Sequence, residues 1–193
     1  MIEIEEIQKL HKKYVGYCNK FLNICNRQPF INLMDELGER AILCPSSQRD
    51  DLHLAHPGGL IRHSLNVLNI FTSVFMKEAS SDELEALTTV SLLHDIGKIG
   101  DKKNEYYLTA NSQRYNYYIN EKLKDMTVPQ RSIKLLTDYG FKLTDEQYIA
   151  ILNSYLFIER IDQWQSVFSL PDLAINLAIA KLLAIKMEKV NKK

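Results

Sequence analysis

The sequence predicts an all-α protein that folds as one helical bundle. Apolar residues return at steps of three and four through most of the 193-residue chain, which is the period of an amphipathic helix. Proline, glycine and capping residues interrupt this period repeatedly, and no segment alternates convincingly as a β-strand would. At this length one domain can bury a sufficient core without disulfides or structural metals. We therefore expect residues 1–193 to form a single domain.

The N-terminal third is expected to contain a long helix, a short helix and a loop. The long helix spans residues 3–26 and ends before Pro29. A shorter helix over residues 30–37 is expected to stop at Gly38, because glycine is a weak helix former. Residues 44–59 hold two prolines, two serines and two glycines, which predicts a loop. Loops often carry functional residues, so this segment is the first place to look for a site.

Capping signals mark where several later helices begin. Ser81 with Asp82 resembles an N-cap, and Thr144 with Gln147 resembles a capping box. Residues 104–120 are polar and tyrosine-rich without a clear period, which indicates irregular structure or a weak helix. The further helices expected are 60–76, 81–97, 129–139, 144–160 and 171–190.

Composition narrows the class of partner. Lysine plus arginine and aspartate plus glutamate both count 24, so the overall charge offers no long-range attraction for nucleic acid, and a phosphate ligand must be held by local groups. No window approaches the roughly 20 apolar residues of a membrane-spanning helix, and the N-terminus lacks the basic start and apolar run of a secretory signal. These features predict a cytoplasmic protein with a pocket rather than a basic surface or a membrane segment.

The three cysteines are expected to be reduced thiols. They form no CxxC pair. Cys18 and Cys25, placed on one helix, would lie roughly 10 Å apart at a rise of 1.5 Å per residue, which is beyond the reach of a disulfide.

A histidine and an aspartate stand side by side at the end of one expected helix. His94 and Asp95 lie in the apolar run VSLLHDIGK, where a polar pair needs a partner. A neutral imidazole and a carboxylate are both good ligands for a divalent ion. His63, early on the preceding helix, is the natural third ligand, and three ligands would leave positions open for water and substrate. The alternative is structural: a core histidine whose orientation Asp95 holds as a hydrogen-bond acceptor.

The loop before His63 adds polar groups and glycines in the run HLAHPGG. Its histidines are His53 and His56. Free N–H groups at a helix N-terminus form an anion site, and we expect Gly58, Gly59 and Arg62 to bind phosphate there. An ordinary turn followed by an N-cap is the alternative interpretation.

The run HLAHPGGLIRHS, followed about thirty residues later by LLHDIGK, resembles the HD phosphohydrolase superfamily. Within it, the pattern is similar to the branch of HD-domain exoribonucleases and small phage-type HD hydrolases. The resemblance is specific over residues 44–98, weaker over 129–188 and absent from the N-terminal helix. It implies an HD-domain helical bundle over residues 44–190, to which residues 1–40 add a long N-terminal helical extension.

The resemblance also implies roles for individual residues. His63 matches the first metal-binding histidine, and His94 with Asp95 matches the His-Asp pair. Lys98 matches a lysine that contacts phosphate, although a lysine at a helix C-terminus also complements the helix dipole. His53 matches the histidine ahead of the glycines. His56, by contrast, stands where an aromatic residue is common.

The second half of the chain departs from the family pattern. Lys181 occupies the position of the distal metal-binding aspartate, and no histidine follows His94, so a two-metal centre is not expected. Asp172, nine residues earlier, would lie on the opposite face of the helix and is a poor substitute. If Lys181 approaches Asp95, its ammonium group would take over the charge role of the ion.

Three functions are compatible with this pattern. The first is metal-dependent hydrolysis of a phosphoester in a nucleotide or short oligonucleotide. The ion would activate water, Lys98 would stabilise negative charge, and His53 or His56 would orient the substrate or protonate the leaving group. Manganese, magnesium, iron, nickel and zinc all remain open, as does the absence of any ion. The second is a degenerate HD protein that binds a nucleotide or a protein partner without turnover. The third is a structural helical protein that forms a homo-oligomer.

Overall fold

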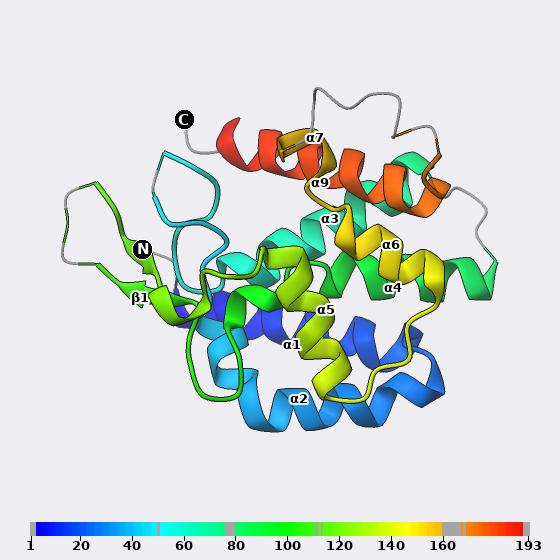
Figure 1. Ribbon diagram of the computed structural model, residues 1–193, viewed down its shortest axis with the longest axis horizontal. Helices are drawn as coiled ribbons and strands as arrows, with labels where there is room; N and C mark the ends of the chain where they lie inside the picture. The colour runs from blue at the N-terminus through cyan, green and yellow to red at the C-terminus, as the bar shows by residue number, and fades with distance from the viewer. Residues whose placement is uncertain are drawn as a thin grey trace.

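A computed structural model describes residues 3–49, 51–75, 80–110, 112, 114–159, 167 and 169–190. In these residues the chain forms a bundle of α-helices with one small β-hairpin (Figure 1), which confirms the all-α class. The elements are α1 (Ile4–Phe21), α2 (Ile24–Leu43), α3 (Gly59–Phe75), α4 (Ser81–Leu93), the 3-10 helix η1 (Ile96–Ile99), β1 (Tyr107–Thr109), β2 (Tyr117–Ile119), the 3-10 helix η2 (Glu121–Leu123), α5 (Val128–Asp138), α6 (Asp145–Leu152), α7 (Leu156–Glu159) and α9 (Asp172–Val190).

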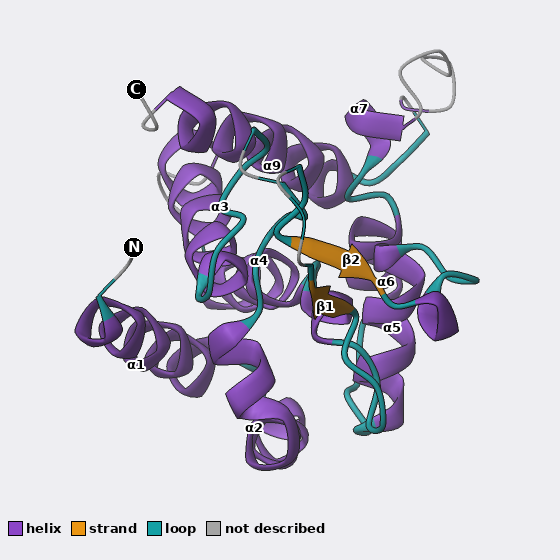
Figure 2. Ribbon diagram, turned by 90° about the vertical axis from the view of Figure 1, so that its left-hand side faces the viewer, coloured by secondary structure: helices purple, strands orange, loops and turns teal. Residues whose placement is uncertain are grey.

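Helix α3 is the centre of the packing. It packs against α4 and α9, and also contacts α1 and α2 (Figure 2). Its side chains Val67, Leu68 and Phe71 are buried in the main core cluster, as expected for a helix with neighbours on several sides. Because α3, α4 and α9 pack together, polar residues on their inward faces are brought to one place.

The two N-terminal helices differ from the prediction in where they divide. The long helix ends at Phe21 rather than residue 26, because Asn23 begins a new helix by accepting a hydrogen bond from the Cys25 N–H at 3.0 Å. The second helix runs to Leu43 instead of stopping at Gly38. Gly38 does not take the positive φ of a helix-ending glycine, and Pro29 is accommodated within the helix.

The later helices begin close to the predicted positions, but two end earlier. Helix α4 is capped by Ser80 in a capping box rather than by Ser81, and it ends at Leu93, because the chain tightens into η1 before reaching Gly97. The predicted capping box of Thr144 is present at the start of α6. That helix ends at residue 152 rather than 160, where the side-chain amide of Asn153 donates to a carbonyl of the last turn.

The tyrosine-rich segment contains an antiparallel hairpin, which the sequence pattern did not predict. Tyr107 pairs with Ile119 and Thr109 with Tyr117. Tyrosine, threonine and isoleucine favour strands, but three residues per strand are too short to show a period. The backbone carbonyl of Gln48 accepts hydrogen bonds from the N–H groups of residues 116 and 117, so the hairpin is attached to the loop over residues 44–58.

Two further expectations concern thiols and membranes. The three cysteines are free; Cys18 and Cys44 are buried and Cys25 is exposed. In the part of the chain that the structure describes, no helix has both the length and the apolar character needed to cross a membrane.

Candidate functional site

The three helices place the predicted polar residues in one buried cluster. His63 comes from α3, His94 and Asp95 from the end of α4, and all three side chains are fully buried. Nε2 of His63 lies 3.8 Å from Oδ2 of Asp95, and Nε2 of His94 lies 3.6 Å from the same oxygen. The two imidazole centroids are 5.7 Å apart, which is close enough for both rings to bind one ion.

Asp95 is held between two lysines. Nζ of Lys98 lies 2.7 Å from Oδ2, and Nζ of Lys181 lies 2.8 Å from Oδ1. Burial alone would raise the pKa of Asp95, but the two ammonium groups outweigh it and hold the pKa well below its ordinary value. Lys98 also donates to the backbone oxygen of Ser46 at 2.8 Å, and the Lys181 ammonium lies 3.3 Å from the ring centroid of Tyr155. Lys181 thus lies beside Asp95, which is the arrangement in which its ammonium group was expected to take over the charge role of an ion.

The two histidines present unprotonated Nε2 atoms to this carboxylate. Nδ1 of His94 lies 2.9 Å from the Ser91 carbonyl oxygen, and Nδ1 of His63 lies 3.0 Å from both oxygens of Glu188, so Nδ1 is the donor in each ring. Burial lowers the pKa of His94 to about 3 and that of His63 well below its ordinary value. Neither Nε2 atom has a hydrogen-bond partner within the described residues.

Glu188 is a member of the cluster that the sequence analysis missed. It lies on α9 two turns after Lys181, accepts hydrogen bonds from His63 and from the Asn66 amide at 2.9 Å, and is buried. Burial raises its pKa, although the Asn66 hydrogen bond opposes this. A spacing of seven residues places Glu188 on the same helix face as Lys181, and this signal would have identified it. Asp172, which had been judged a poor substitute, is exposed.

Only one of the two loop histidines joins the cluster. The His53 ring centroid lies 5.0 Å from that of His63, and its Nε2 atom is buried without a partner among the described residues. Burial, with a smaller effect from His63, lowers the pKa of His53 to about 2. His56 instead places Nδ1 3.0 Å from the adjacent Pro57 carbonyl oxygen.

The two glycines before α3 allow the loop to fold tightly. Gly58 has a φ of +77°, a conformation that side chains disfavour. A Cβ atom on Gly59 would lie 2.1 Å from the Leu54 carbonyl oxygen and 2.9 Å from the Ser46 amide nitrogen. Glycine at 59 therefore permits the loop that carries His53 and Ser46 to lie against the start of α3.

The start of α3 is not arranged as the expected phosphate site. The Gly59 N–H donates to the His56 carbonyl and the Leu60 N–H donates to the Cys44 carbonyl, each at 3.0 Å, so these amides are already satisfied. The guanidinium of Arg62 pairs with Glu6 of α1. The expectation that Gly58, Gly59 and Arg62 bind phosphate therefore has no support in this geometry, which is that of a tight turn.

The cluster contains two sets of potential metal ligands that share His63. The first set is His63, His94 and Asp95, and the second is His53, His63 and Glu188; in each, the ligand atoms lie within 4.8 Å of one another. A divalent ion in the first set would meet two ammonium groups that already occupy both Asp95 oxygens. The residues present therefore do not fit an ion at that position, even though two of its three ligand atoms have no other partner.

A pocket of about 470 Å³ adjoins the cluster at Lys98, a volume within the range of small-molecule sites. Its walls include Arg40 of α2 and three tyrosines of the hairpin region, Tyr106, Tyr107 and Tyr117. Among the predicted site residues, Lys98 is the member that contributes to this wall.

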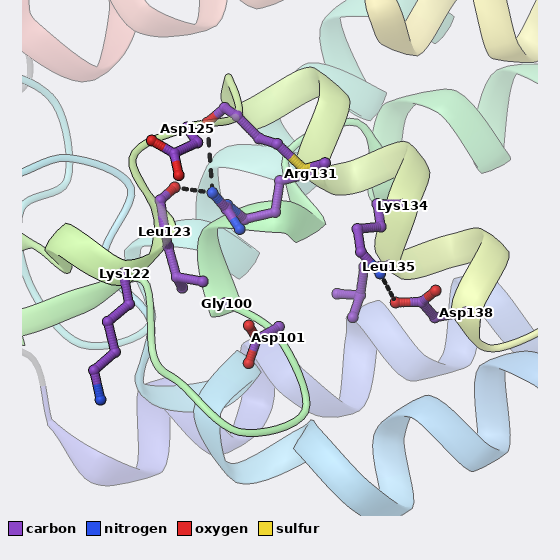
Figure 3. Close-up of a pocket in the computed structure, with 10 residues that line it drawn as sticks. Gly100, Asp101, Lys122, Leu123, Asp125, Arg131, Lys134, Leu135 and Asp138 are labelled. Carbon is purple, nitrogen blue, oxygen red and sulfur yellow. Dashed lines mark hydrogen bonds and ion pairs between the residues drawn. The ribbon is translucent and has the colours of Figure 1, made fainter.

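A smaller pocket of about 240 Å³ lies between η2 and α5 and contains none of the predicted site residues (Figure 3). Two of its basic side chains already have partners in the pocket wall. Arg131 donates to the Leu123 carbonyl, and Lys134 pairs with Asp138.

Comparison with known proteins finds one family. The model of the HD domain matches residues 60–153, a range that includes His63, the His-Asp pair and Lys98 and ends before Lys181. No curated protein and no solved structure matches the chain.

Proposed function

The chain belongs to the HD-domain superfamily, and we propose that it is a degenerate member that binds a nucleotide without hydrolysing it. Members of this superfamily are usually metal-dependent phosphohydrolases. Lys181 takes the place of the metal ion. The observation that carries this proposal is the pair of ammonium groups that occupies both oxygens of Asp95.

Charge balance supports the exchange of an ion for a lysine. The two buried carboxylates, Asp95 and Glu188, are matched by the ammonium groups of Lys98 and Lys181, and burial keeps the imidazoles neutral. In the family pattern, an aspartate stands at the position of Lys181 and binds the ion. One lysine carries the same net charge as one aspartate together with one divalent ion, so the substitution keeps the buried charge unchanged.

The pocket beside Lys98 supports a nucleotide as the ligand. Tyr106, Tyr107 and Tyr117 line it, and aromatic side chains are the groups on which bases commonly stack. Arg40 provides a guanidinium group, which is suited to phosphate. Its Nη1 donates to the Asp101 carbonyl at 2.7 Å and its Nε lies 4.0 Å from Glu105, so a phosphate would be bound by the remaining N–H groups. Glu105 also lines the pocket and can accept hydrogen bonds from ribose hydroxyls. These lining residues and the volume of about 470 Å³ support a nucleoside monophosphate as the proposed ligand.

Titration calorimetry with AMP in the presence of EDTA tests the binding. We expect the wild type to bind AMP without any ion, and Arg40→Met to weaken binding at least about tenfold through loss of a charged hydrogen bond. Lys102→Met is the matched control, because Lys102 pairs with Glu36 on the surface and does not line the pocket. Absence of AMP binding, or equal binding by the Arg40 variant, would contradict the proposal.

Hydrolysis is a second candidate, because the Nε2 atoms of His63 and His94, which have no hydrogen-bond partner in the described part of the chain, both face Asp95. Incubation of the wild type with manganese and bis(4-nitrophenyl) phosphate separates the two functions. The proposal predicts no release of 4-nitrophenol. Release that His94→Gln abolishes would instead identify the chain as a metal-dependent hydrolase.

A further inference from the structure

The second set of metal-binding atoms lies on the opposite edge of the His63 ring from Asp95. Three segments contribute one residue each: the loop over residues 44–58 contributes His53, α3 contributes His63 and α9 contributes Glu188. His63 and Glu188 are buried, and Nε2 of His53 is a buried atom with no hydrogen-bond partner in the described part of the chain. Among the described residues, no lysine forms with these three side chains a hydrogen bond or ion pair of the kind that holds Asp95.

The spacing of these atoms suits a shared ion. Nδ1 of His63 lies 3.0 Å from each oxygen of Glu188. Two ligand atoms that bind one ion at about 2.1 Å lie about 3.0 to 3.4 Å apart, depending on the angle between them. The pair therefore already has the separation of two ligands, and His53, whose ring lies 5.0 Å from that of His63, is within reach as a third.

Binding at this set would also give a partner to the far side of His63. An ion on Nδ1 moves the ring proton to Nε2, and Nε2 faces Oδ2 of Asp95 at 3.8 Å. A carboxylate that receives the second N–H of a metal-bound imidazole is a common outer-shell arrangement. In that arrangement Asp95 orients His63 and does not itself bind the ion.

The two ligand sets differ in electrostatics. Each Asp95 oxygen accepts a hydrogen bond from a lysine ammonium group, whereas Glu188 accepts hydrogen bonds from the neutral side chains of His63 and Asn66. An ion beside Glu188 therefore displaces no lysine. Three protein ligands leave a coordination position for water or an anion. Because His53 is partly exposed, the His53, His63 and Glu188 set lies closer to solvent than the His63, His94 and Asp95 set.

We propose that His53, His63 and Glu188 bind one divalent transition-metal ion of the zinc type. Two imidazoles and one carboxylate are a known ligand set for zinc. The ion would join the loop, α3 and α9, and thereby hold the segments that surround the Lys181–Asp95 pair. This inference goes beyond the proposed nucleotide binding and does not rest on it, because Lys181 keeps its place beside Asp95 whether or not the ion is bound.

Calorimetric titration of untagged, chelator-treated protein with zinc chloride tests the site, with thermal unfolding as a second readout. We expect the wild type to bind one zinc ion and to gain thermal stability from it. Glu188→Gln and His53→Gln should each weaken zinc binding at least about tenfold. Glu188→Gln keeps an acceptor for His63 and Asn66, and His53 lies on a loop, so both variants are expected to fold.

Two further variants locate the ion. His56→Gln is the matched control for His53, since it is the same change in the same loop outside the ligand set. His94→Gln reports on the other set, to which His94 belongs and His53 does not. Unchanged binding by both of these variants, with loss in the first two, supports the proposal. Zinc binding that is absent in the wild type, or that survives Glu188→Gln and His53→Gln, overturns it. Loss of zinc binding with His94→Gln alone also overturns it, and places the ion at Asp95. Failure of AMP binding, by contrast, would refute only the proposed function.

Discussion

Replacing Lys181 with methionine removes one of the two counter-charges of a fully buried carboxylate. Lys181 is 1% exposed and its Nζ lies 2.8 Å from Asp95. Breaking a buried ion pair by removal of one partner costs about 3 to 5 kcal/mol. Because Lys98 remains on the other oxygen and methionine fills much of the space, we expect the low end, about 3 kcal/mol lost from the free energy of unfolding at pH 7.

Urea denaturation followed by far-UV circular dichroism measures this loss. At a typical slope of about 1 to 3 kcal/mol per molar urea, the midpoint should fall by about 1 M or more. Lys134→Met is the control: its pair with Asp138 is short, but the two side chains are 51% and 37% exposed, so we expect a change below about 0.5 kcal/mol. A loss below about 1 kcal/mol for the Lys181 variant would refute the view that the Lys181 ammonium group stabilises the buried Asp95 carboxylate.

Three further predictions concern stability. Burial holds the pKa values of His63 and His94 below the value near 6.5 of an unfolded histidine, so the unfolded chain binds more protons than the folded one below pH 6.5. The free energy of unfolding should therefore decrease as the pH is lowered, by about 1.4 kcal/mol per histidine at pH 5.5. Urea midpoints that stay level from pH 7 to 5.5 would contradict this. Gly59→Ala should prevent normal folding, because the added Cβ would overlap a backbone carbonyl oxygen. Gly16→Ala is the control: this glycine is exposed within α1 with nothing nearby, so the change should raise the free energy of unfolding by up to about 1 kcal/mol in the same assay. Asn26→Ala should cost about 2 kcal/mol in urea denaturation, because the buried Asn26 makes two hydrogen bonds to the backbone before α6; a cost near zero would mean that water replaces them.

The fold was predictable where amphipathic period and capping agreed, and less so elsewhere. Helix α9 and the capping box of Thr144 followed the sequence signals closely. The division between α1 and α2 did not, because Cys25 continues the apolar period of α1 while Asn23 restarts the helix through a local hydrogen bond. The hairpin at Tyr107 was missed because its short strands depend on contacts with the loop over residues 44–58, which no local pattern encodes.

The site residues also differ in how far the sequence could predict them. His63, His94 and Asp95 were identifiable from their residue types and from their positions on two consecutive helices. The family pattern drew attention to Lys181, but its contact with Asp95 was stated only as a condition, which the structure meets. Glu188 was overlooked because no family position suggested it, although its spacing from Lys181 does. The N-terminus of α3 was misjudged, because its amides are taken by carbonyls from a loop whose path the sequence does not specify.

The most direct test of the exchange of an ion for Lys181 is a manganese titration of the wild type and Lys181→Asp, followed by calorimetry, with circular dichroism to show that both are folded. The exchange predicts that the variant gains one tight manganese site beyond whatever the wild type binds, because the repulsion at Asp95 is removed and a further carboxylate ligand is supplied. Identical stoichiometry and affinity in the two folded proteins would contradict the claim that Lys181 occupies the place of the ion.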